Sequence, residues 1–200
     1  MDRTYAVGPR PVTHRRALAW GGVIGPVGFV TAWATAGAVT SGYSPVEDAI
    51  SRLAAIHAPT RWVMTAGFVC FGVAVPVYSV ALRDALGGRA WLAAMVTGLA
   101  TLGVAAVPLD VSKTTDLVHG GFASVGYAAL ALTPVLAAGP LARRGHRRAA
   151  SVSRAVGVLS GACLAATTVG SASGLFQRAG LTLGDLWLAA SATAIIRRLI

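Results

Sequence analysis

The sequence predicts an all-α membrane protein, a polytopic bundle of six transmembrane helices. The chain has 200 residues, of which 55% are hydrophobic and 12% charged, and its mean hydropathy is +0.67. Soluble domains carry roughly a quarter charged residues. Apolar runs recur along the chain, each close to the roughly 20 residues that cross a bilayer as a helix. The charged residues gather between these runs.

The chain begins with a polar, basic segment, residues 1–16, in which Pro9 and Pro11 argue against a long helix. We expect this segment to be a short tail at the membrane surface. The first apolar run, Ala17–Thr40, carries no charge over 24 residues and is longer than the apolar part of a signal peptide. We interpret it as a retained first span, with residues 17–200 forming a single membrane domain.

The segment Tyr43–His57 is predicted to be a short amphipathic helix on the outer surface, between spans 1 and 2. Ser44 suits the N-cap, Pro45 the first helical position, and Glu47 the place three residues after the cap. Apolar and charged residues then separate onto two faces at helical spacing. A helix of about three turns is too short to span a bilayer.

Five further apolar runs complete the predicted bundle. They are Trp62–Leu82, Ala90–Leu109, Leu117–Leu141, Ala155–Phe176 and Leu181–Ile196. The sixth span is the least regular because Asp185 falls within it, and we expect Gln177 and Arg178 to lie in the link before it. Glycine and other small residues recur throughout, which suits close helix packing in lipid.

The distribution of lysine and arginine predicts the orientation, because cytoplasmic loops carry the excess. A cytoplasmic N-terminus places 13 of the 17 basic residues inside, against only Asp2 and Asp84 among the acids. The outer side then holds four basic and five acidic residues, Asp185 among them. We therefore expect a multi-pass protein of the cell membrane with both termini cytoplasmic. The basic loop 143–148 either contacts anionic lipids or serves only to set the topology.

Several function classes are excluded by the pattern. The net charge of +10 does not indicate nucleic-acid binding, because the basic residues lie between apolar runs. Cys70 and Cys163 each stand alone, so neither a metal site nor a disulfide framework is indicated, and no GxSxG motif is present. We expect no metal, no cofactor and no nucleic acid. Membrane lipids are the expected partners, and the sequence predicts no particular protein partner.

The polar groups that carry chemistry gather at one end of the predicted bundle. The candidate catalytic residues are Asp48, Glu47, Asp110, His119 and Asp116. Two pairings leave alternatives open. Asp48 lies four residues before Arg52 and can simply pair with it along a helix. Asp116 lies three residues before His119, so the two either form a couple for proton transfer or mark where the helix leaves the lipid.

These groups favour a small membrane enzyme that acts on a lipid or isoprenoid by acid–base chemistry. In its most specific form, a buried carboxyl group, Asp48, Glu47 or Asp110, donates a proton that starts cyclisation of a prenyl chain. Aromatic rings would then stabilise the carbocation. The candidate substrate-binding residues are Tyr43, Trp62, Trp33, Phe68, Tyr127 and Arg178.

Two other functions remain open on the sequence. One is a non-enzymatic accessory protein of an envelope complex, and the other is a small carrier. A carrier places ionisable groups near the middle of the bilayer, whereas the middles of spans 1, 2, 3 and 5 contain none.

Five short motifs resemble those of one bacterial integral-membrane family. They are Ser44-Pro45, Ile50-Ser51-Arg52-Leu53, Pro59–Met64, Pro108–Asp110 and His119-Gly120, with looser agreement around Gln177-Arg178 and Trp187. In this pattern the chain is similar to the family called "domain of unknown function 998". The resemblance implies a compact six-helix membrane fold, and it gives no information about activity.

Overall fold

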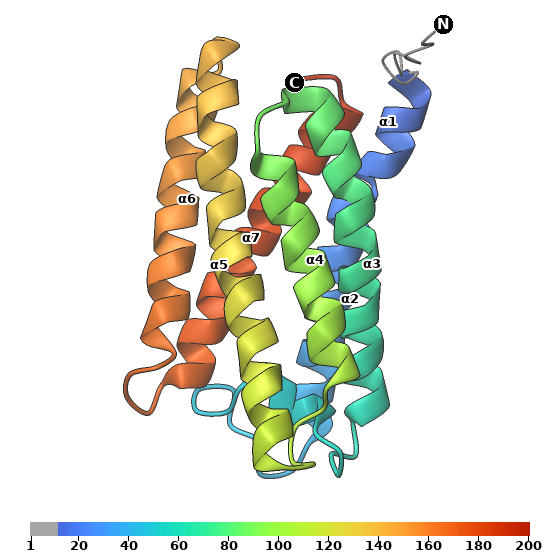
Figure 1. Ribbon diagram of the computed structural model, residues 1–200, viewed down its shortest axis with the longest axis vertical. Coiled ribbons are helices and arrows are strands. Elements are labelled where there is room, and N and C mark those ends of the chain that lie inside the picture. The colour runs from blue at the N-terminus through green and yellow to red at the C-terminus, as the bar shows by residue number, and fades with distance from the viewer. Residues whose placement is uncertain (1–11) are drawn as a thin grey trace, which may run out of the picture.

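The computed structural model describes residues 12–200, and every regular element in that range is a helix (Figure 1). In chain order these elements are α1 (Val12–Ala19), α2 (Gly21–Val39), the short 3₁₀ helix η1 (Ile50–Ala54), α3 (Arg61–Leu86), α4 (Ala90–Ala106), α5 (Lys113–Arg143), α6 (Arg147–Ala166) and α7 (Ser173–Ile196). The long helices run up and down in one bundle, as predicted.

Five of these helices are long and apolar enough to cross a membrane, with α1 and α2 together forming one of them, Thr13–Val39. The sixth, α4, has 17 residues and is apolar along its length. At 1.5 Å per residue it is about 25 Å long, near the lower limit for a span. It packs against α3 and α5, which completes the predicted six-helix bundle.

The bundle has two chemically different ends. We call the end formed by loops 40–60, 107–112 and 167–172 the polar end. The opposite end, formed by loops 87–89 and 144–146 and by the C-terminus, is the basic end. The C-terminus and the start of α1 both lie at the basic end, at the top of Figure 1.

Two helices, α6 and α7, differ most from their predicted bounds. α6 begins at Arg147 and ends at Ala166, whereas the sequence predicted Ala155–Phe176. The turn that follows contains Gly170 with φ +80°, a conformation that glycine adopts without strain. α7 therefore starts at Ser173, so Gln177 and Arg178 lie inside a helix rather than in a link. Asp185 lies in the middle of α7, and its predicted place on the outer side was wrong.

The predicted three-turn helix at Tyr43–His57 was also wrong in extent. The structure has only η1, a five-residue 3₁₀ helix that begins at Ile50. Residues before it form turns because Asp48, not Glu47, reaches back: its Oδ2 accepts a hydrogen bond of 2.8 Å from the Ser44 backbone N–H. Residues 12–16, which we expected in the N-terminal tail, belong to α1. The rest of the tail lies outside the described residues.

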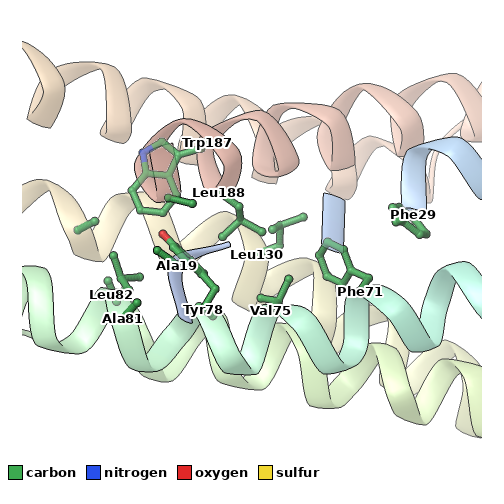
Figure 2. Close-up of a cluster of buried hydrophobic side chains, with 14 of the residues drawn as sticks. Ala19, Phe29, Phe71, Val75, Tyr78, Ala81, Leu82, Leu130, Trp187 and Leu188 are labelled. Carbon is green, nitrogen blue, oxygen red and sulfur yellow. The ribbon is translucent and has the colours of Figure 1, made fainter. Parts of the chain in front are cut away.

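Polar contacts inside an apolar core hold α7 to its neighbours. Tyr78 of α3 is fully buried, points toward α7 in Figure 2, and its hydroxyl lies 2.6 Å from the Ser191 hydroxyl. The Trp187 indole N–H donates to the Ser153 hydroxyl of α6 at 2.8 Å. Hydrogen bonds between helices supplement van der Waals packing in lipid, where apolar burial alone gives no driving force. They therefore help to fix α7 across the bundle.

The contact between α5 and α6 depends on a small residue at Gly157. A Cβ there would lie 2.5 Å from the Val135 side chain and 2.6 Å from the Ala131 carbonyl oxygen. Gly157→Val should therefore lower the free energy of unfolding by about 1–3 kcal/mol through overpacking. Thermal unfolding in detergent measures this loss. Gly120→Val, where a Cβ meets nothing within 4 Å, is the control. Equal stability of the two variants would contradict the packing described.

Candidate functional site

A narrow chamber of about 50 Å³ lies inside the bundle near the polar end. Ile50 and Ser51 of η1 line it at the polar end, and its lining on α5 runs inward from Phe122 to Leu130. The wall is mostly aromatic or aliphatic, with a few hydroxyl and amide groups. The remaining lining residues are Phe29, Phe68, Phe71, Thr97, Thr101, Val104, Ala123, Gly126, Tyr127, Gln177 and Leu181.

Gln177 of α7 joins the chamber wall to the loop above it. Its side-chain oxygen accepts a 2.7 Å hydrogen bond from the Ile50 backbone N–H, and its amide nitrogen donates to the Tyr127 hydroxyl. Gln177 is 5% exposed, so both bonds are made away from water. A buried amide whose partners are lost costs about 1–3 kcal/mol. The side chain thus sets the position of η1 over the chamber.

Arg178, the next residue of α7, holds the loop that precedes η1. Its guanidinium donates to the carbonyl oxygens of Pro45 at 2.8 Å and Asp48 at 3.0 Å. It also donates to the Gly174 carbonyl at 2.9 Å and to the Tyr43 hydroxyl. The residue is 8% exposed, and these partners, all uncharged, take the place of its water. The backbone of the loop is thereby fastened to α7.

Two aromatic rings complete the surroundings of this guanidinium. It lies 5.4 Å from the ring centre of Trp33 and 5.4 Å from that of Tyr43, within the range of cation–π attraction. Burial raises the pKa of the Tyr43 phenol above its ordinary value, although the neighbouring Arg178 opposes this rise. Tyr43 therefore keeps its proton at neutral pH and is a hydrogen-bond partner rather than a base.

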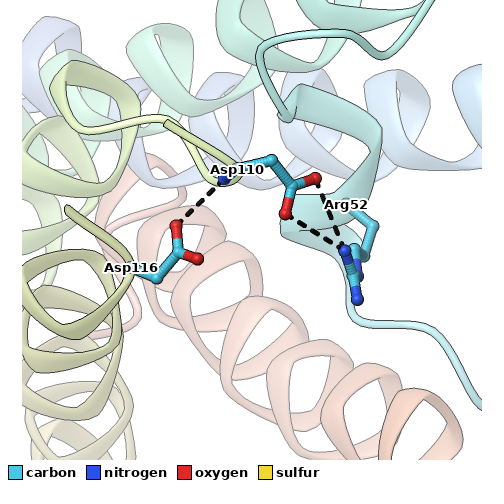
Figure 3. Close-up of polar contacts among 3 residues, drawn as sticks. All are labelled: Arg52, Asp110 and Asp116. Atoms are coloured by element: carbon cyan, nitrogen blue, oxygen red, sulfur yellow. Dashed lines mark hydrogen bonds and ion pairs between the residues drawn. The ribbon is translucent and has the colours of Figure 1, made fainter. Parts of the chain in front are cut away.

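The carboxylates predicted as catalytic mainly hold loops together. The predicted pairing of Asp48 with Arg52 was wrong: Arg52 pairs instead with Asp110, at 3.3 Å, and both side chains are exposed (Figure 3). Asp110 has φ 67°, and its backbone N–H donates to Asp116 Oδ1 at 2.9 Å. Glu47 is exposed at the surface. None of these four acids lines the chamber.

His119 stands apart from these acids. It is 4% exposed, and its Nδ1 lies 2.6 Å from the Val107 carbonyl oxygen rather than beside Asp116. Because a carbonyl oxygen only accepts, Nδ1 must carry the hydrogen, and Nε2 of the neutral ring then has a free lone pair. Nε2 is buried and has no hydrogen-bond partner. His119 precedes the chamber residues Phe122 and Ala123 by one helical turn on the same face of α5.

The predicted substrate-binding residues fall into three places. Phe68 and Tyr127 line the chamber. Trp33 and Tyr43 flank the Arg178 guanidinium instead. Trp62 is 72% exposed and stacks with Arg61, with 4.7 Å between the guanidinium carbon and the ring centre. The structure therefore brings two of the six to the chamber wall.

The sequence reasoning missed Phe29, Phe71 and Phe122, which line the chamber, and the roles of Gln177 and Asp185. The three phenylalanines lie in apolar runs, where nothing in a single sequence distinguishes a ring facing a chamber from one facing lipid. Gln177 and Asp185 did carry a signal, because a polar residue inside an apolar helix is costly unless it has a function or a partner. Within residues 12–200, no three potential ligand side chains cluster to form a metal site.

Comparison with known proteins gives one match. The model of a protein family described as "Protein of unknown function (DUF998)" matches residues 23–194, which leave out α1, the first two residues of α2 and the last two of α7 but include the whole candidate site. No curated protein and no solved structure matches the chain.

Replacing Arg178 tests whether its guanidinium holds the loop to α7. Arg178→Leu leaves the Pro45, Asp48 and Gly174 carbonyls without a donor that carries charge, and each such bond is worth about 1.5–3 kcal/mol. We expect a loss of at least about 3 kcal/mol in the free energy of unfolding, measured by denaturation in detergent. Arg52→Ala, which breaks an exposed pair, should cost about 1 kcal/mol or less. Losses of equal size would contradict the assignment.

Proposed function

The chain belongs to the DUF998 family, whose function is unknown, and we propose that it is a small membrane enzyme acting on a lipid or isoprenoid by acid–base chemistry. The observation that carries the proposal is the aromatic chamber beneath the polar end. Phe29 stacks at an angle against Phe68 and Phe71, with ring centres 5.8 and 5.4 Å apart. Such rings hold a hydrocarbon chain and stabilise a cation that forms on it.

The size of the chamber suggests how a substrate would lie. A volume of about 50 Å³ has room for about four water molecules, so it admits the end of a chain rather than a whole lipid. An amphiphile would place its hydrocarbon end in the chamber and its polar head at the polar end, where the hydroxyl and charged groups are. This arrangement favours a prenyl chain attached to a polar head, as in protonation-initiated cyclisation.

Of the five predicted catalytic residues, His119 is best placed for acid–base work. Its free Nε2 is buried one helical turn from the chamber residues Phe122 and Ala123, on the polar side. There it would accept a proton from the part of the substrate nearest the head. Asp48, Asp110 and Asp116 would support the site by holding the loops that cover it, whereas the Glu47 side chain is exposed at the surface.

We also propose that the protein lies in the cell membrane with its basic end in the cytoplasm. The basic residues described at this end are Arg15, Arg16, Arg83, Arg89, Arg143, Arg144, Arg147, Arg148, Arg154, Arg197 and Arg198. Arginine and lysine accumulate in cytoplasmic loops, and anionic headgroups of that leaflet attract them. The chamber would then open toward the outer side.

A photoreactive isoprenoid tests the proposed substrate class. Geranylgeraniol carrying a diazirine should crosslink to chamber residues of α3 and α5 in proteoliposomes, detected by mass spectrometry of peptides. Gly126→Leu, which fills the chamber where a Cβ has 3.5 Å to Ala100, should reduce this crosslinking several-fold. Gly121→Leu on the same helix, where a Cβ meets nothing within 4 Å, should leave it unchanged.

The outcomes separate the candidate functions. Crosslinking by a matched palmitoyl probe in place of the isoprenoid would shift the substrate to acyl lipids. Failure of both probes, together with a stoichiometric protein partner after purification in mild detergent, would contradict the enzyme and indicate an accessory protein.

Orientation has its own test. Single cysteines can replace the exposed residues Ser171 and His146, which lie in turns at opposite ends of the bundle. In a Cys70→Ala, Cys163→Ala background, a membrane-impermeant maleimide should label the first in intact cells and the second only after lysis. The reverse pattern would overturn the proposed orientation.

A further inference from the structure

Asp185 is a carboxyl group in the middle of a membrane-spanning helix. It lies twelve residues after the start of α7 at Ser173 and eleven before its end at Ile196. The residue is 3% exposed, and both of its carboxyl oxygens are buried without a hydrogen-bond partner. Ionisable groups at this depth are rare because they are costly, and those that occur usually serve a function.

No cation in the described part of the chain compensates this carboxyl group. Metal binding needs several ligands, and no group of three candidate ligand side chains exists in residues 12–200. Arg178, two turns away on the same face of α7, is committed to the loop at the polar end. The buried phenols on neighbouring helices are also committed, Tyr78 to Ser191 and Tyr127 to Gln177. The ligand that remains for the carboxyl group is a proton.

Asp185 does not itself line the chamber, but it lies one helical turn beyond the lining at the inner end. Leu181, one helical turn before it on the same face of α7, lines the chamber. Gly184, the residue next to Asp185, lies against the chamber residue Leu130, since a Cβ there would be 2.5 Å from the Leu130 side chain. His119 lies one turn beyond the chamber in the opposite direction, toward the polar end. The chamber therefore lies between an acid and a base, each with unpartnered atoms.

We propose that Asp185 is the proton donor that starts the reaction, an assignment that rests on the proposed function. The carboxyl proton adds to a carbon of the terminal double bond of a prenyl chain, whose π electrons form the new C–H bond. The π electrons of the next double bond then form a C–C bond to this carbocation, which closes the ring and leaves a new carbocation. A C–H bond beside it breaks, its electron pair forms a C=C double bond, and the proton goes to His119 Nε2. The product is an isomer of the substrate. Water then takes the proton from His119 and supplies one to Asp185.

The direct test follows the transferred proton. Proteoliposomes in D₂O are incubated with geranylgeraniol, and the products are examined by mass spectrometry for a deuterium bound to carbon. Wild type should incorporate deuterium. Asp185→Asn should lose this incorporation at least a hundredfold, while photo-crosslinking of the diazirine probe stays unchanged. Asp185→Glu, which retains a carboxyl group, should recover part of the activity.

A second measurement reports on Asp185 without turnover. The infrared C=O stretching band of a protonated carboxylic acid should be present in the wild type at neutral pH and absent in Asp185→Asn. Undiminished deuterium incorporation by Asp185→Asn, or the lack of such a band in the wild type, would overturn the proposal.

The remaining outcomes separate this proposal from the proposed function. A wild-type protein that crosslinks the probe but forms no deuterated product overturns the donor role and leaves isoprenoid binding intact. If the probe fails to crosslink, the proposed function falls and the donor role falls with it, even where the infrared band shows Asp185 protonated.

Discussion

The structure depends on two buried polar residues of α7 that hold a loop from the other half of the chain. Gln177 binds the backbone of η1 and Arg178 binds the backbone just before it. A loop of this kind has unpaired backbone groups that would otherwise need water. By supplying donors and an acceptor from inside the helix, α7 lets the loop lie over the end of the bundle. Held in this position, Ile50 and Ser51 of η1 form part of the chamber wall.

Different ionisable groups lie beyond the two ends of the chamber. Near the polar end the wall includes Ser51 and the Gln177 amide, and His119 lies one turn beyond it, whereas Asp185 lies beyond the inner end. Interactions between charges and aromatic rings are stronger where little water is present. An amphiphilic substrate therefore has one orientation in which each part meets suitable groups, and the proposed proton transfers act at its two ends.

The fold was largely predictable from the sequence, because an apolar run of about 20 residues crosses a bilayer as an α-helix. The position of α7 was not. Gln177 and Arg178 look like a polar link when hydropathy alone is considered, and their burial becomes evident only when the loop that they bind is in place. Asp185 was counted on the outer side for the same reason, although it lies in the middle of α7. The prediction for Tyr43–His57 was wrong for a related reason. Residues of α7 hydrogen-bond the backbone groups of this segment, so they need no partners within a three-turn helix.

The most direct test of this account is the exchange rate of individual backbone amides, measured by NMR on the protein in nanodiscs. The Ile50 amide donates to Gln177, and the Leu175 amide donates to the Val46 carbonyl at 2.9 Å, so each reports on the contact between the loop and α7. The account predicts that both exchange as slowly as amides within the spanning helices. Exchange as fast as that of the exposed Gly42 amide would contradict it.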